Sequence, residues 1–266
     1  MAEQDRLLHT IEEVTATMEG TTVGATTPGE ETRGAPDAAT LNPAEKAYGP
    51  FDVIQPEGFH RGLLDRNVSK PNSYFGQAFG WERSILQATA DRAHALGAIT
   101  LLDIGCGTGN TLRTWATAAR QHVTDPSKVT ALGINLHDYS RESRFAQTRE
   151  AIAAGEIGYT VGNAEQLHEF FPRASADVVT ACMSLIHMRR PTLAAIQIAR
   201  VLRPGGVAFL NVPEDLNVSG SPLMEAIYKL EDAGFIIDTR TGIVPAPTSG
   251  KSWSTLFVRM ERPEAS

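Results

Sequence analysis

The chain has 266 residues, of which 42% are hydrophobic and 21% charged, so it can bury one substantial core and carry an appendage. Its formal net charge of -7 and pI of about 5.5 argue against a protein that binds nucleic acid by neutralising phosphates. No run approaches the roughly 18 apolar residues that cross a bilayer, and no basic-then-apolar signal segment opens the chain. These features predict a cytoplasmic protein with no nucleic-acid or membrane partner.

Residues 1–41 are predicted to form a flexible tail that contains one amphipathic helix. Over residues 4–18, apolar side chains recur at helical spacing: Leu7, Leu8, Ile11, Val14 and Met18. Gly, Thr, Pro, Ala and Glu dominate residues 20–40, and such a segment buries too little apolar surface to offset its ordering entropy. The helix either docks on the core or on a second copy, giving a homodimer, or forms only transiently in the tail.

Residues 42–97 are predicted to form a helical lid over a binding pocket. Asn42 is a favourable N-cap, and Pro43 suits the first helical position. The segment is dense in aromatic side chains, which suit a pocket for an organic molecule, although ordinary core packing explains any one of them equally well. Leu86, Ala90, Ala93 and Leu96 form one apolar stripe at helical spacing, which predicts a helix packed on the sheet. Gly97 is a favourable residue to end that helix.

A predicted buried strand followed by a glycine-rich loop is the most informative feature. The apolar run at 98–102 leads directly into DIGCGTG at 103–109. Glycines there let the backbone turn tightly and approach a ligand, and a helix predicted over 110–120 points its first amides at the same place. This junction predicts a nucleoside cofactor. The acidic residue precedes the glycines, which disfavours nicotinamide and flavin cofactors, whose fingerprint is G-x-G-x-x-G with the acid about 20 residues later.

Four further strands follow in the order that a doubly wound α/β sheet requires. Apolar runs predict them at 129–136, 157–161, 176–182 and 207–212. A helix that closes over 196–201 and the turn LRPGG at 202–206 lead into the last of these strands. The two cysteines, Cys106 and Cys182, have the spacing of neither a disulfide framework nor a zinc site and are expected to be small buried residues.

From residue 98 to 262 the chain resembles the class I S-adenosylmethionine-dependent methyltransferases, of the type that acts on small molecules. The motifs that carry the resemblance are LLDIGCGTG at 101–109, GNAEQL at 162–167 and RVLRPGG at 200–206, with their mutual spacing. The resemblance implies a Rossmann-like sheet of seven strands with an antiparallel last strand, the final two at 235–241 and 254–261. It also implies S-adenosylmethionine as the cofactor and residues 98–266 as the methyltransferase core.

The resemblance further implies roles for matching residues. Asp103 would help order the loop and the methionyl ammonium, Asn135 would grip the ribose hydroxyls, and Asn163 with the Ala164 amide would meet the adenine edge. Tyr74, from the leading segment, is expected near the methionyl carboxylate. The expected cofactor-binding residues are Tyr74, Asp103, Gly105, Cys106, Gly107, Gly109, Asn110, Asn135, Leu136, Asn163, Ala164, Glu165 and Met183.

Two of these positions depart from the family pattern, which has an acidic residue at both the ribose and the adenine. Asn135 and Asn163 still offer an acceptor oxygen and two N–H donors each. What they lack is a charge-assisted hydrogen bond, which is about twice as strong as a neutral one. We therefore expect weaker or differently tuned cofactor binding, with loss of binding as the alternative.

The transferable methyl group of this cofactor is already electrophilic, so the protein's main task is to align acceptor, methyl carbon and leaving sulfur. For a hydroxyl acceptor, a general base adds roughly 10²- to 10⁴-fold. His187, just beyond the predicted fourth strand, is the first candidate, with a packing role as the alternative, and His60 in the predicted lid is the second. No metal is predicted, because carboxylates do not converge after that strand.

The expected function is methyl transfer to an O, N or C atom of a small organic acceptor, in specialised metabolism. Two alternatives keep the same fold and pocket: a non-methylating cyclisation or rearrangement, and a protein that binds the cofactor without catalysis. A nucleic-acid methyltransferase is the least favoured, because the chain is acidic.

Overall fold

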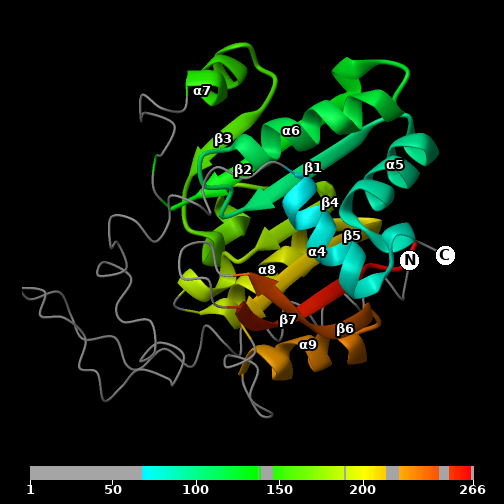
Figure 1. Ribbon diagram of the computed structural model, residues 1–266, viewed down its shortest axis with the longest axis vertical. Coiled ribbons are helices and arrows are strands. Elements are labelled where there is room, and N and C mark those ends of the chain that lie inside the picture. Colours follow the sequence, from blue (N-terminus) through cyan, green and yellow to red (C-terminus); the bar gives the residue numbers. More distant parts are fainter. Residues whose placement is uncertain are drawn as a thin grey trace, which may run out of the picture.

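The computed structural model describes residues 68–136, 138, 146–188, 190–213, 222–245 and 252–264. Within them lies a seven-stranded sheet of order β3-β2-β1-β4-β5-β7-β6 (Figure 1). The strands are β1 Ile99–Ile104, β2 Val129–Asn135, β3 Gly158–Val161, β4 Ala176–Cys182, β5 Leu202–Pro213, β6 Ile236–Pro245 and β7 Ser252–Glu261. The strands from β3 to β5 run parallel, whereas β7 is antiparallel to both β5 and β6. This mixed sheet confirms the predicted Rossmann-like class and its antiparallel end.

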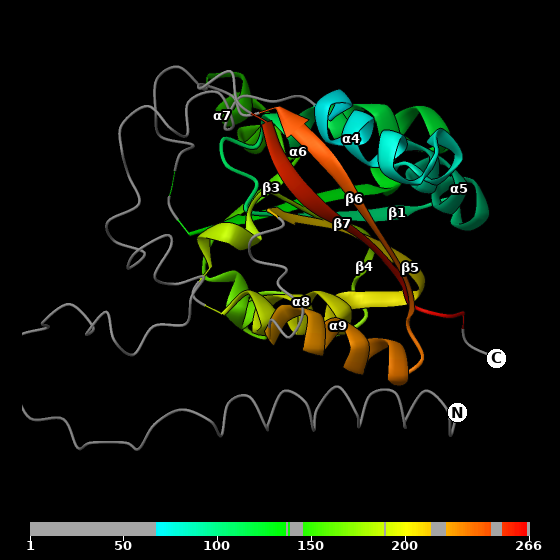
Figure 2. The same cartoon turned by 60° about the horizontal axis from the view of Figure 1, so that its bottom comes forward.

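Helices cover both faces of the sheet (Figure 2). One face carries α4 Ser69–Phe79, α5 Ile85–Leu96 and α6 Asn110–Ala119, and α7 Ala146–Ala153 contacts α6. The other face carries α8 Pro191–Val201 and α9 Pro222–Asp232. Short 3-10 turns are η2 Trp81–Arg83, η3 Arg120–His122, η4 Pro126–Lys128, η7 Ala164–Glu169 and η8 Leu185–His187. In this described portion, every helix is too short or too polar to span a bilayer.

Alternating residues of the parallel strands build two cores, one on each face. On the α4 face, the ring of Phe75 packs edge-on against Phe209 of β5 and Phe257 of β7, with both pairs of ring centroids 5.3 Å apart. Phe79 joins the same cluster, stacked on Phe75. The aromatic side chains of α4, which the sequence left open between pocket and core, therefore belong to the core.

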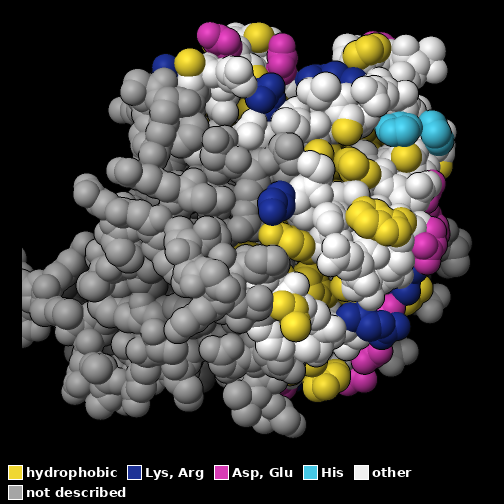
Figure 3. Space-filling model, in the orientation of Figure 1, with side chains coloured by type: hydrophobic (Ala, Val, Ile, Leu, Met, Phe, Trp, Pro, Cys, Tyr) yellow, Lys and Arg dark blue, Asp and Glu magenta, His cyan; other side chains and the backbone are white. Residues whose placement is uncertain are grey.

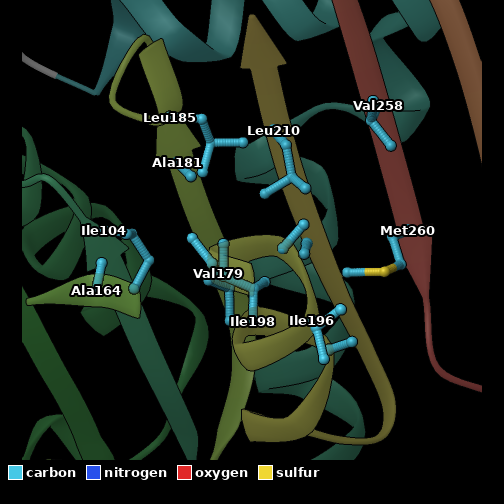
Figure 4. Packing of buried hydrophobic residues seen from close by; sticks show 14 of the residues in the cluster. Ile104, Ala164, Val179, Ala181, Leu185, Ile196, Ile198, Leu210, Val258 and Met260 are labelled. Atoms are coloured by element: carbon cyan, nitrogen blue, oxygen red, sulfur yellow. The ribbon is translucent and has the colours of Figure 1, made fainter. Parts of the chain in front are cut away.

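On the opposite face, the strands pack against α8 (Figure 4). Val179 of β4 and Leu210 of β5 contribute to this cluster, together with Ile196 and Ile198 of α8. Because each strand gives alternate side chains to the two cores, a polar residue inside a strand must find a partner within the sheet. The buried polar residues of the site described below meet this requirement by bonding to a neighbouring strand or to the turn that follows it.

Most element boundaries lie within a few residues of the sequence prediction, and two of the differences have a clear cause in strand pairing. Strand β1 continues to Ile104, beyond the predicted end at residue 102, because Asp103 and Ile104 pair with Gly133 and Ile134 of β2. Strand β5 begins at Leu202, ahead of the predicted start, because Leu202 already pairs with Ala176 before the register shifts. The apolar run can be recognised in the sequence, but the pairing with a neighbouring strand, which lengthens the strand beyond that run, cannot.

Helix α5 ends at the predicted Gly97, whereas its N-terminal signal was not identified from the sequence. Ser84 is its N-cap, with its hydroxyl accepting from the Gln87 N–H, and Gly97 ends the helix in the left-handed conformation at φ 65°. The predicted stripe is wrong at Leu96, which is 49% exposed. The buried face instead runs through Ile85, where the helix meets the sheet core.

The surface over α4, α5 and α6 mixes side chains of every kind (Figure 3). Acidic, basic and hydrophobic groups are interspersed on this view of the described residues, with no field of one sign. The predicted tail at 1–41, the first part of the predicted lid and His60 all lie outside the described residues. Their roles therefore stay predictions from the sequence.

Candidate active site

The glycine-rich loop links β1 to α6 at the carboxyl edge of the sheet. Gly105, Gly107 and Gly109 all take positive φ, at 70°, 54° and 78°. At Gly105 a side chain is also excluded by space, because a Cβ there would lie 2.4 Å from the Cβ of Ser184. The loop thus passes in direct contact with the segment that follows β4, as only glycine allows.

Three hydrogen bonds to β2 and β3 fix the shape of this loop. The amides of Gly105 and Cys106 both donate to the Ile134 carbonyl, at 2.8 and 3.2 Å. From β3, the Tyr159 hydroxyl donates to the Gly107 carbonyl at 2.6 Å. The sequence prediction missed Tyr159, since nothing in a four-residue strand marks one aromatic side chain as a support for a distant loop.

Asp103 lies at the end of β1, buried beneath the loop. Its carboxylate accepts a hydrogen bond from the Thr180 hydroxyl of β4 at 2.7 Å. Burial raises the pKa of Asp103 from 3.8 to about 7, and the Thr180 hydrogen bond offsets only part of that effect. Asp103 therefore sits where a cationic ligand group would favour its charged form.

Cys106 is buried within the loop, as expected. Burial raises the pKa of its thiol well above the usual range, and the nearby Asp103 carboxylate adds to the effect. The sulfur therefore stays protonated and acts as a small apolar group. In the part of the chain that the structure describes, no group of three or more His, Cys, Asp or Glu is placed to hold a metal ion.

The turn after β4 is the most constrained part of the site. Met183 adopts a positive φ of 57°, which is unusual for a residue with a side chain. Its N–H donates to the side-chain oxygen of Asn211, a fully buried residue of β5, at 2.7 Å. Ser184 follows, buried against Gly105, and His187 ends the next 3-10 turn in a half-buried position.

Sequence reasoning missed Asn211 and gave Ser184 no role. Among the described residues, neither the Asn211 amide nitrogen nor the Ser184 hydroxyl has a hydrogen-bond partner, although both atoms are buried. Buried polar atoms without partners are rare and mark places where a ligand or water completes the structure. A signal did exist: Asn211 interrupts the apolar run VAFLNV at 207–212.

The ends of β2 and β3 carry the two asparagines predicted to contact the nucleoside. Asn135 ends β2 half-buried, and its carbonyl accepts from the Gly162 N–H at 3.0 Å. Asn163 follows β3 and caps η7, its side-chain oxygen accepting from the Glu165 N–H at 2.9 Å. Leu136 lies next to Asn135 and is 38% exposed. The strand order β3-β2-β1-β4 thus places Asn163, Asn135, the glycine loop and Met183 in succession along one edge.

Three other residues predicted to bind the cofactor make contacts within the protein. Tyr74 is buried on α4 within the core cluster of that face. The Asn110 side chain accepts from Arg113 at 2.9 Å within α6. The Glu165 carboxylate accepts from both the backbone N–H and the side chain of Arg190, at 2.9 and 3.1 Å. Contact between these side chains and a cofactor stays a prediction.

Comparison with known proteins identifies the domain that holds this edge. A family model described as "Methyltransferase domain" matches residues 102–210. The O-methyltransferase rstn1 of Aspergillus nomiae is 37% identical over 105 residues, which is 40% of this chain and 42% of that protein. The sterol 24-C-methyltransferase erg-4 of Neurospora crassa is 32% identical over 148 residues, which is 50% of this chain and 35% of that protein.

These matches therefore span less than half the length of either relative. The crystal structure of the [4+2]-cyclase SpnF is also similar, with 20% identity, a TM-score of 0.46, and coverage of 70% of this chain and 83% of that chain. The domain match, the sheet order and the glycine-rich loop agree with one another. Residues 102–210 thus match a methyltransferase domain.

Proposed function

We propose that the chain transfers a methyl group from S-adenosylmethionine to a small organic acceptor. The observation that carries this proposal is the succession of Asn163, Asn135, the glycine loop and Met183 along the carboxyl edge of β3, β2, β1 and β4. The positive-φ glycine loop lies at its centre, and buried polar atoms without partners lie beside it. An extended nucleoside fits such a row, because each strand end offers hydrogen-bonding groups to a different part of it.

The residues present fit this cofactor at each step along the edge. The loop backbone and the amides that open α6 would hold the methionyl end, near the buried Asp103 carboxylate. Asn135 would hold the ribose, and the turn at Asn163 the base. The bound cofactor supplies a methyl group on a sulfonium, which needs no further activation.

The chain's own contribution is therefore alignment. The Asn211 hydrogen bond fixes the Met183 turn, and this turn sets Ser184 against the glycine loop. A rigid turn at this place holds donor and acceptor in line, and orientation of that kind lowers a barrier by roughly 7 to 11 kcal/mol. For a hydroxyl acceptor, we propose that a ring nitrogen of His187 takes the proton.

The acceptor is proposed to be a small molecule with oxygen or carbon as its methylated atom. One relative is named an O-methyltransferase and the other a sterol 24-C-methyltransferase, and both names support this choice. A role in specialised metabolism stays a prediction from the sequence. A second acceptor class, nucleic acid, finds no support in the acidic composition.

Calorimetric titration with S-adenosylhomocysteine, followed by mass spectrometry of reactions with a panel of small phenols and sterols, tests the proposal. We expect saturable binding and a product heavier by one methyl group. Absence of heat at millimolar ligand would overturn the proposal. Binding accompanied by a product of unchanged mass would instead establish a rearrangement or cyclisation.

A further inference from the structure

Thr180 carries the one hydroxyl group of strand β4, and it lies beside Asp103. The pairing of β1 with β4 sets Asp103 opposite Thr180, so the two side chains leave the sheet on the same face. Both are buried, at 5% and 2% exposure, and the Thr180 hydroxyl donates to Oδ1 of Asp103 at 2.7 Å. The register of the two strands thus places a hydrogen-bond donor on this carboxylate.

The hydrogen bond has two effects on the Asp103 carboxylate. Because a carboxylate is planar, a bond that holds Oδ1 also fixes the direction of Oδ2. A hydroxyl donor also favours the charged form, so Thr180 opposes the burial that raises the pKa of Asp103 to about 7. Thr180 therefore acts on both the direction and the charge of this group.

The surroundings of Asp103 give Thr180 this influence. On the other side, β2 brings Gly133, which has no side chain. The loop brings the Cys106 thiol, whose raised pKa keeps it neutral. Among the described residues, burial and Thr180 are the causes that shift the pKa of Asp103, and no cationic side chain contributes. A cationic group on a ligand would therefore find a carboxylate that only Thr180 prepares for it.

We propose that Thr180 is a positioning residue for the cofactor, because it keeps the Asp103 carboxylate charged and directed at the cofactor's amino group. The inference rests on the proposed function, which places the methionyl end of S-adenosylmethionine at the glycine loop beside Asp103. The ammonium of that end favours the ionised carboxylate, so binding to the empty protein releases part of a proton from Asp103. Thr180 makes that release easier.

The test measures the affinity for S-adenosylhomocysteine by calorimetry across a pH series, in wild-type protein and in Thr180→Val. Valine keeps the branched shape of threonine, suits a strand and lacks the hydroxyl. Its loss should raise the pKa of Asp103 by about one unit. The variant should therefore bind about tenfold more weakly than wild type at about pH 6. At about pH 8.5 the difference should shrink to about twofold or less, because Asp103 is then largely ionised in both proteins.

Thr89→Val is the matched control, because it makes the same change in another buried threonine. The Thr89 hydroxyl accepts from the Trp115 indole N–H at 2.9 Å and donates to the Ile85 carbonyl at 2.7 Å, on α5. This variant should bind with wild-type affinity at every pH. Thr180→Ser keeps the hydroxyl and should keep the wild-type pH profile.

Two results would overturn the inference: a loss of affinity in Thr180→Val by the same factor at every pH, which is the mark of a structural role, or an unchanged affinity at about pH 6. Melting curves confirm that the variants fold. Thr180→Ala, which also removes the hydroxyl, takes the place of Thr180→Val if the latter does not fold. Wild-type protein that binds no ligand at any pH would overturn the proposed function instead.

Discussion

The side-chain oxygen of Asn211 accepts the backbone N–H of Met183 at 2.7 Å, and Met183 is held at a φ of 57°. A non-glycine residue in this region costs about 1 to 3 kcal/mol and persists only where its surroundings impose it. Here the imposing group comes from the neighbouring strand, since Asn211 pairs with Cys182 in the β4–β5 ladder. The pairing of β4 with β5 thus places Asn211 where its side chain fixes the turn that carries Ser184.

Replacing Asn211 by Ala should lower both stability and cofactor affinity. The change leaves the Met183 N–H unpaired in a buried place, which costs about 1 to 3 kcal/mol of unfolding free energy. It also releases the turn that presses Ser184 against Gly105, so the affinity for S-adenosylhomocysteine should fall. Urea denaturation measures the first effect and calorimetry the second.

Asn72→Ala provides the matched control for that variant. The Asn72 side-chain oxygen accepts from the Leu86 N–H at 2.8 Å, a partly buried bond that joins α4 to α5. Its loss should cost a comparable unfolding free energy and leave ligand affinity within a factor of about two. Equal losses of affinity in both variants would show that Asn211 acts only through general stability.

The buried Asp103 predicts a pH dependence of opposite sign to that of most carboxylates. Its pKa is raised from 3.8 to about 7 by burial, so the folded empty protein holds this proton more tightly than the unfolded chain does. The stabilising contribution is complete below pH 3.8 and is lost as the pH rises through about 7. Melting temperatures of wild-type protein and Asp103→Asn across this range measure it. Parallel pH profiles for the two proteins would show that Asp103 does not titrate there.

His187→Ala separates a proton acceptor from a packing residue. If His187 takes the acceptor's proton, the variant should bind S-adenosylhomocysteine as wild type does and turn over roughly 10²- to 10⁴-fold more slowly on a hydroxyl acceptor. The rate should also lose the ionisation of an imidazole from its pH profile. Weakened ligand binding with an unchanged pH profile would instead assign His187 to the support of the turn after β4.

The sequence predicted the sheet well, because each parallel strand is a continuous apolar run. Strand β4 was placed at Ala176–Cys182 as observed, and the predicted final two strands correspond to β6 and β7. Ends were less certain where the ladder decides them, as at Asp103, a polar residue kept in β1 by its pairing with β2. Pattern detects burial, whereas the end of a strand depends on hydrogen bonds to a neighbour that pattern does not contain.

The candidate site was predicted only where a motif marks it. The glycine loop stands out because three glycines follow a strand, and the structure gives all three positive φ. Asn211 and Tyr159 were missed because each acts across the sheet, on Met183 and on the Gly107 carbonyl. Such contacts are set by strand order and register, and one sequence does not contain the distance between residues far apart in the chain.

Gly105→Ala tests whether the loop needs glycine for its conformation or for its contact with the turn after β4. Gly97 offers the comparison, since its φ of 65° is close to the 70° of Gly105 while nothing lies within 4 Å of its added Cβ. Both variants should lose about 1 to 2 kcal/mol of stability from the left-handed backbone. Only Gly105→Ala must also displace Ser184, whose Cβ lies 2.4 Å from the new methyl group, so only this variant should lose affinity for S-adenosylhomocysteine. Full ligand affinity in Gly105→Ala would show that the loop and the Ser184 turn are not coupled.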